Sequence, residues 1–77
     1  MDLRDTFATN LRRLRNAKAL SQDDLAYGAG VSRSYLSQLE KGEFHASLMI
    51  IGRLAEALDV EPAEFLRLQP RRPRRAR

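Results

Sequence analysis

Four polar side chains share the spacing of one exposed stripe on a helix, at positions i, i+1, i+4 and i+5: Arg33, Ser34, Ser37 and Gln38. Arginine can donate two hydrogen bonds to O6 and N7 of a guanine, and glutamine can pair with N6 and N7 of an adenine. Serine reads bases less specifically. The stripe therefore predicts contacts with base edges in the major groove of DNA. The alternative is a polar helix face that contacts only water.

The stripe belongs to residues 22–41, whose small and apolar side chains have the spacing of two short helices joined at a tight corner. Gly30 suits a left-handed backbone after the first helix, and Ser32 suits the N-cap of the second. Ser21 and Asp24 have the spacing of a capping box. The pattern predicts a helix-turn-helix, which presents its second helix to DNA; the alternative is an ordinary αα-hairpin inside a bundle. The small and apolar residues expected at the corner and its inner face are Leu25, Ala26, Ala29, Gly30, Val31, Leu36 and Leu39.

The rest of the chain also has helical periodicity, so the predicted fold class is all-α. The first three helices are expected over about residues 3–18, 22–28 and 32–41. Ser47 is a good N-cap for a fourth helix, and Pro62 suits the first turn of a fifth. The inward side chains expected for the first and fourth helices are Leu3, Phe7, Leu11 and Leu14, and Leu48, Ile51, Leu54, Ala55 and Leu58.

The net charge of +4 comes from residues 70–77, PRRPRRAR, which have nothing to bury and are predicted to form a disordered Arg/Pro-rich tail. Residues 1–69, the predicted DNA-binding domain, carry nine cations and ten acids, so their net charge is −1. A DNA-binding surface must therefore come from local clusters of charge, such as Arg12, Arg13, Arg15 and Lys18. The tail could add a salt-dependent attraction to DNA, or it could only aid solubility.

The composition argues against several other functions. The chain has no cysteine, and its single histidine, His45, has no partners at metal-ligand spacing, so no metal site is expected. No nucleophile–base pair, phosphate-cradling glycine loop or pair of catalytic carboxylates is recognisable. We therefore expect no enzyme, no cofactor and no small-molecule substrate. No apolar run approaches about 18 residues and no signal peptide is recognisable, which predicts a cytoplasmic protein with no membrane partner.

Four segments carry a resemblance to a known family: LRRLR at 11–15, LSQDDLA at 20–26, GVSRSYLSQLEKG at 30–42 and LAEALDVEPAEFL at 54–66. Over residues 3–68 the chain resembles the phage-repressor and Cro family, the lambda-repressor-like or XRE group of DNA-binding domains. The resemblance implies a compact five-helix domain with the helix-turn-helix as helices 2 and 3. It also implies a bacterial or phage transcriptional regulator, expected to be a repressor. Such a regulator would bind a pseudo-palindromic operator in double-stranded DNA as a homodimer.

The resemblance also assigns roles to single residues. The stripe at 33–38 matches the base-reading positions of the family, and Gln22 matches a glutamine that contacts a phosphate. Arg15 and Glu40 match an ion pair that ties the reading helix to the core; the alternative is two surface charges that never meet. For Tyr35, a phosphate contact and stacking on the preceding helix are equal alternatives. The weaker candidates for phosphate contacts are Ser21, Ser32, Tyr35, Lys41 and His45.

A single helix-turn-helix reads only a few base pairs, so a homodimer that spans half-sites roughly 34 Å apart is expected. Two groups of apolar side chains are candidates for its interface, one late in the domain and one around the start of the fourth helix: Phe65, Leu66 and Leu68, and Phe44, Met49 and Ile50. The first group could instead pack inward. In the family, the loop that holds Phe44 commonly carries cations and a proline, and the positions of Met49 and Ile50 are commonly polar. The second group therefore predicts an exposed apolar patch. Met49 or Ile50 could instead fill space left by Gly52.

Two other functions fit the same residues. A DNA-binding protein of this kind could be an antitoxin or a restriction–modification controller. Outside DNA binding, the acidic balance of residues 1–69 and the patch of Phe44, Met49 and Ile50 would suit a protein-interaction module.

Overall fold

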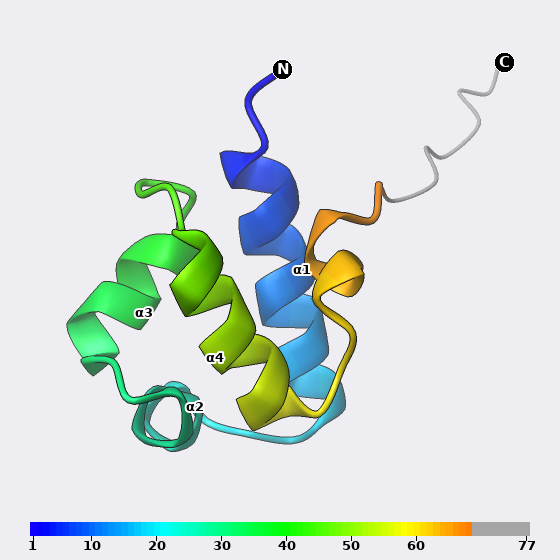
Figure 1. Cartoon of the computed structure of the whole chain (residues 1–77). Helices are drawn as coiled ribbons and strands as arrows, with labels where there is room; N and C mark the ends of the chain where they lie inside the picture. Colours follow the sequence, from blue (N-terminus) through cyan, green and yellow to red (C-terminus); the bar gives the residue numbers. More distant parts are fainter. Residues whose placement is uncertain (69–77) are drawn as a thin grey trace, which may run out of the picture.

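The computed structural model describes residues 1–68, and every regular segment within that range is helical. The predicted tail at 70–77 lies outside the described residues. Among residues 1–68, no helix is both long and apolar enough to cross a bilayer. Figure 1 shows the elements in chain order: α1 (Arg4–Ala17), α2 (Gln22–Ala29), α3 (Arg33–Glu40), α4 (Leu48–Leu58) and the 3₁₀ helix η1 (Pro62–Leu66).

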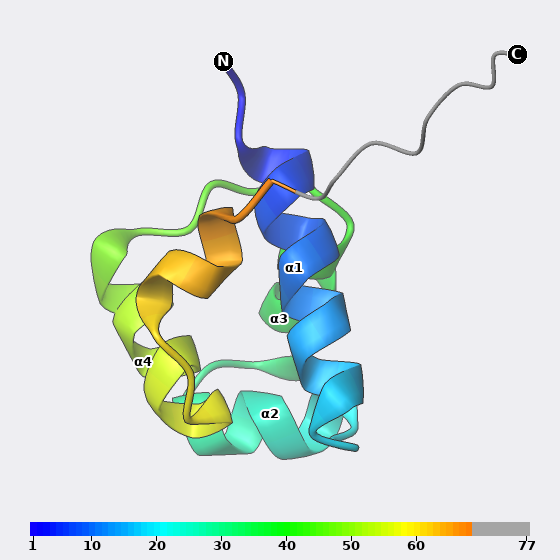
Figure 2. The same cartoon turned by 90° about the vertical axis from the view of Figure 1, so that its right-hand side faces the viewer.

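One apolar core lies between the four α-helices and η1. Figure 2 shows α1 and α4 on opposite sides of the domain, with α2 beneath them. Each helix turns one face inward because its apolar residues recur at spacings of three and four. Phe7 of α1 contacts Phe65 of η1, and their ring centroids are 5.2 Å apart. The core side chains are Phe7, Leu11, Leu14, Leu25, Ala26, Ala29, Leu36, Leu39, Ile50, Leu54, Ala55, Leu58 and Phe65.

The corner between α2 and α3 has the predicted backbone. Ser21 Oγ accepts the N–H of Asp24, and the Asp24 carboxylate accepts the N–H of Ser21, which completes the capping box. Gly30 ends α2 with a φ of 72°, a left-handed value that costs glycine little. Ser32 Oγ accepts the N–H of Tyr35 and starts α3. The helix-turn-helix is confirmed, with α2 and α3 as its two helices.

The turn between α1 and α2 contains a non-glycine residue in the left-handed region. Ala19 has a φ of 57°, and the N–H of Leu20 donates to the carbonyl of Arg15 at 3.2 Å. This conformation is unfavourable for an L-residue, so the turn carries local strain. The turn sets where α2 begins relative to α1.

The predicted fifth α-helix is instead a short 3₁₀ helix. Pro62 begins it as expected, but extended backbone resumes at Arg67, with φ −67° and ψ 125°. Asn10 of α1 explains the early end, because its Nδ2 donates to the carbonyls of Phe65 and Arg67, each at 2.8 Å. A side chain thus binds the carbonyls that a longer helix would use for its own hydrogen bonds. The prediction of five α-helices is therefore wrong in this element.

The start of α4 also differs from the prediction. Leu48, expected to face inward, is 86% exposed, whereas Ile50, expected in an exposed patch, is buried. Ile50, Leu54 and Leu58 recur every four residues and share the inner face of α4. Leu48 lies about 200° around the helix from Ile50, on the opposite face. A Cβ at Gly52 would point into open space, so there is no gap at that position for a neighbour to fill.

Candidate nucleic-acid interface

Helix α3, which carries the predicted stripe, lies at the left-hand edge of the domain in Figure 1. Arg33 and Ser34 are exposed, whereas Ser37 and Gln38 are half-buried. The inner face of α3 carries Leu36 and Leu39, which are fully buried. The stripe, one residue of α2 and the residue after α3 together line one concave surface, which we call the polar hollow: Gln22, Arg33, Ser34, Ser37, Gln38 and Lys41. The fold therefore gathers the four predicted base-reading side chains on one surface.

A largely buried ion pair lies beside the polar hollow. Arg15 of α1 donates to both carboxylate oxygens of Glu40, with Nε–Oε2 at 2.7 Å and Nη2–Oε1 at 3.0 Å. The Arg15 side chain is 15% exposed and that of Glu40 only 3%. The hydrogen bonds to Glu40 raise the pKa of the Arg15 guanidinium above its ordinary value. The predicted pair is present, and the alternative of two separate surface charges is wrong.

Further hydrogen bonds extend this pair into a network that joins α1, α2 and α3. Gln22 Nε2 donates to Glu40 Oε1 at 3.0 Å, and Arg15 Nη1 donates to the carbonyl of Leu20 at 2.9 Å. Arg12 Nη1 donates to the main-chain carbonyl of Glu40. Helix α1 thus holds both the side chain and the backbone at the end of α3. Sequence reasoning missed this role of Arg12, although its spacing of three from Arg15 places both on one helix face.

The predicted phosphate-contacting groups are only partly free. The hydroxyl oxygens of Ser21 and Ser32 accept capping hydrogen bonds, but each hydroxyl keeps a hydrogen to donate. The side-chain amide of Gln22 is bound to Glu40, whereas its main-chain N–H belongs to the first turn of α2 and has no acceptor within that helix. Lys41 is exposed and lines the polar hollow. His45 lies elsewhere and lines a largely apolar pocket together with Leu3, Arg4, Phe7, Phe44, Ala46, Ile51 and Leu66.

Tyr35 stacks on Phe44, in the loop after α3, and not on α2. The two ring centroids are 5.8 Å apart and the ring planes differ by 30°. Stacking of Tyr35 on α2, one of the two predicted alternatives, is therefore wrong, because the ring stacks on Phe44 instead. An aromatic residue in the loop that follows α3 is the signal that could have indicated this contact.

Gln38 has one unsatisfied polar atom. Its Oε1 is buried and accepts no hydrogen bond from the residues at 1–68. A buried acceptor without a donor costs about 1–3 kcal/mol.

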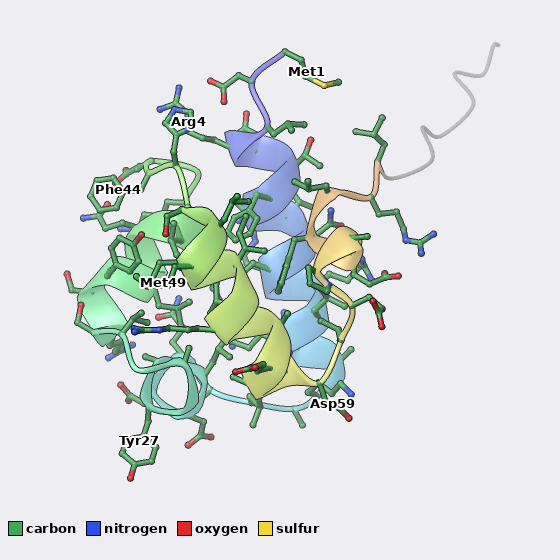
Figure 3. The ribbon with its side chains drawn as sticks, viewed as in Figure 1. Met1, Arg4, Tyr27, Phe44, Met49 and Asp59 are labelled. Carbon is green, nitrogen blue, oxygen red and sulfur yellow. The ribbon has the colours of Figure 1, made fainter. Side chains whose placement is uncertain are left out.

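The candidate interface side chains divide into buried and exposed residues. Phe65 and Ile50 belong to the core, so their assignment to a dimer interface is wrong. Figure 3 shows Phe44 and Met49 on the same side of the domain, and Tyr27 pointing away from α2. Tyr27 is 91% exposed, and no sequence pattern singles it out. The candidates that remain accessible are between 43% and 61% exposed: Phe44, Met49, Leu66 and Leu68.

Known proteins share this architecture. The pattern of the helix-turn-helix family HTH_3 matches residues 11–65, which include the corner and the whole stripe. An uncharacterised HTH-type transcriptional regulator of Sinorhizobium fredii is 36% identical over 66 residues, which cover 86% of each chain. The control protein C.SmaI of Serratia marcescens is 35% identical over 69 residues, which cover 90% of this chain and 82% of that protein.

The fold is also similar to that of a solved restriction-modification controller protein. The crystal structure of the restriction-modification controller protein C.AhdI from Aeromonas hydrophila is similar, with a TM-score of 0.78 and 47% sequence identity. The similarity covers 80% of this chain and 94% of that one.

Proposed function

Because this chain belongs to the helix-turn-helix family HTH_3, we propose that it is a transcriptional regulator that reads an operator in double-stranded DNA. In this proposal α3 enters the major groove and the polar hollow faces the base edges. The observation that carries the proposal is the gathering of Arg33, Ser34, Ser37 and Gln38 on the outer face of α3. We place the protein in the cytoplasm, where it would meet such an operator.

Each side chain of the stripe has a role in this proposal. Arg33 donates two hydrogen bonds to a guanine, and Gln38 pairs with an adenine. Each such bidentate contact discriminates against a wrong base by about 1–3 kcal/mol. Ser34 and Ser37 add contacts that are less specific.

Base reading requires α3 to keep a fixed position relative to the phosphates. The network around Glu40 supports this requirement, since Arg12 and Arg15 hold the end of α3 and Gln22 ties it to the start of α2. In the proposal, the N-terminal N–H groups of α2 and the hydroxyls of Ser21 and Ser32 contact phosphates, with Lys41 beside them.

We propose that the protein acts as a homodimer on a pseudo-palindromic operator. Two copies would place their α3 helices in major grooves roughly 34 Å apart. The exposed apolar side chains available for such an interface are Phe44, Met49, Leu66 and Leu68.

A specific observation favours a narrower role, that of a restriction–modification controller. The protein C.AhdI, which bears that description, is 47% identical to this chain over 94% of its own length. The control protein C.SmaI is 35% identical. In this second candidate the operator lies upstream of genes for a restriction–modification system. Footprinting on the DNA that flanks the gene tests it: protection upstream of a neighbouring endonuclease gene supports the role.

Selection of binding sites from random duplex DNA at physiological salt tests the proposed function. The parent should enrich one motif with two related halves. Arg33→Ala should relax the preference at a guanine, and Gln38→Ala at an adenine, each by about 1–3 kcal/mol. Arg67→Ala is the matched control, because it also removes one exposed cation but lies beyond η1, away from α3.

The outcomes separate the claims. If the parent enriches no motif, operator reading is wrong and a protein-interaction module becomes the better description. If a motif appears and survives both α3 substitutions unchanged, the stripe is not the reading surface. Sedimentation that shows only monomers, both at high micromolar concentration and on the selected site, would remove the homodimer.

A further inference from the structure

Asp23, in the first turn of α2, faces the arginine of the stripe across the corner. Its Oδ1 lies 3.6 Å from Arg33 Nε, and the two side chains are 73% and 63% exposed. The fold does not use this carboxylate for the capping box, which is made by Ser21 and Asp24. Its place in the first turn of α2 already favours an acid there, as it does for Asp24. On a DNA-facing surface the same negative charge opposes phosphate binding, so its contact with Arg33 bears on recognition as well.

The side of the guanidinium that Asp23 contacts matters. An arginine can offer a pair of parallel N–H groups from Nη1 and Nη2, which suits guanine O6 and N7. Asp23 lies against Nε, on the lateral edge. The terminal pair of N–H groups is therefore left available for a base, while the carboxylate lies as an ion-pair partner at the side of the guanidinium.

We infer that Asp23 is a specificity-determining positioning residue, which orients Arg33 for guanine and weakens its attraction to phosphate where no guanine is present. This inference rests on the proposed function. Among residues 1–68, only Arg33 and Lys41 are cations that line the polar hollow, and Asp23 offsets one of these two charges. Non-specific DNA binding depends almost wholly on cations that neutralise phosphates. Asp23 thus lowers affinity for every duplex but lowers it least where Arg33 has a guanine to bind.

The test compares the full chain with Asp23→Asn on the selected operator and on an unrelated duplex, by fluorescence anisotropy over a series of salt concentrations. Affinity for the unrelated duplex should rise roughly two- to fivefold, the range set by an exposed ion pair. Its salt dependence should steepen by up to about one phosphate contact. The ratio of operator affinity to unrelated-duplex affinity should fall by at most the same roughly two- to fivefold factor, because operator affinity rises less.

Three further variants distinguish an orienting effect of Asp23 on Arg33 from the general effect of one negative charge. Glu56→Gln removes one exposed acid from α4 and should leave the ratio unchanged. Asp23→Glu keeps the carboxylate and should restore part of the ratio. In an Arg33→Ala background, Asp23→Asn should no longer alter discrimination at the guanine.

The inference is overturned if Asp23→Asn keeps the parent ratio, or if Glu56→Gln lowers it equally. It is also overturned if Asp23→Asn acts as strongly without Arg33 as with it. A parent protein that binds all duplexes equally overturns the proposed function as well, and this result is seen before any variant is compared. Thermal unfolding of each variant by circular dichroism identifies any loss of fold.

Discussion

Replacement of Arg15 by methionine would measure how far the buried ion pair stabilises the fold. In the parent, the Glu40 carboxylate accepts two hydrogen bonds from Arg15 and one from Gln22. Arg15→Met removes the first two together with the positive charge. The remaining carboxylate belongs to a side chain that is only 3% exposed. Removal of one partner of a buried pair costs about 3–5 kcal/mol, and we expect a loss of that size in the free energy of unfolding.

The hydrogen bonds lost from Glu40 give a similar value for the decrease in the free energy of unfolding. A hydrogen bond to a charged group contributes about 1.5–3 kcal/mol, so the loss of the two bonds to Glu40 amounts to about 3–6 kcal/mol. The bond from Arg15 Nη1 to the carbonyl of Leu20 is lost in addition. A chain of this length is usually stable by about 4–12 kcal/mol. Arg15→Met should therefore remove a large part of the stability, and the variant should unfold at clearly lower urea concentration.

Urea unfolding followed by the helical circular dichroism signal provides the assay. Arg67→Met is the matched control, since it breaks an arginine–glutamate pair of similar length, 2.6 Å, that is far more exposed. Such an exposed pair should contribute little. The double variant Arg15→Met, Glu40→Met removes both charges and should recover most of the loss. If Arg15→Met unfolds at the same urea concentration as Arg67→Met, the reasoning from burial is refuted.

Two further predictions concern the turns and the N-terminus. Ala19→Gly should raise the free energy of unfolding by about 0.5–1 kcal/mol, because glycine adopts a left-handed backbone without strain. Gly30→Ala should lower the Tm for the same reason, and Tm shifts of the same sign in both variants would contradict this account of backbone strain. The hydrogen bonds from Arg4 lower the pKa of Asp2 from 3.8 to about 2. A pKa that is lower in the folded state means that the contact stabilises the fold above pH 3.8 and is lost as the pH falls towards about 2. An NMR titration of Asp2 with a midpoint near 3.8 would exclude the contact.

The corner of the helix-turn-helix was predictable because its chemistry is local. Ser21 and Asp24 are three residues apart, and Gly30 and Ser32 each act within a few residues of their own positions. Such cap signals are readable without any knowledge of the tertiary fold. The resemblance added the Arg15–Glu40 pair, whose members are 25 residues apart and share no local signal.

The predictions for α4 and for the last helix were wrong because the same residues are compatible with more than one packing. Residues 48–51 are all apolar, so either the face of α4 that carries Leu48 or the face that carries Ile50 could pack against the core. The sequence pattern does not indicate which of the two is buried. The length of the last helix depends on Asn10, whose acceptors are main-chain carbonyls 55 and 57 residues away. Because the acceptors are main-chain carbonyls, the contact does not require particular side chains at residues 65 and 67, and no sequence pattern there indicates it.

That same property of Asn10 affects how this surface can change. Because the amide binds the carbonyls of residues 65 and 67, the path of the chain does not depend on which outward side chains it carries. Leu66 and Arg67 are both exposed at this point, whereas Phe65 is fixed in the core. A substitution at 66 would therefore change the outer surface at this point without altering the path of the chain or the position of α3.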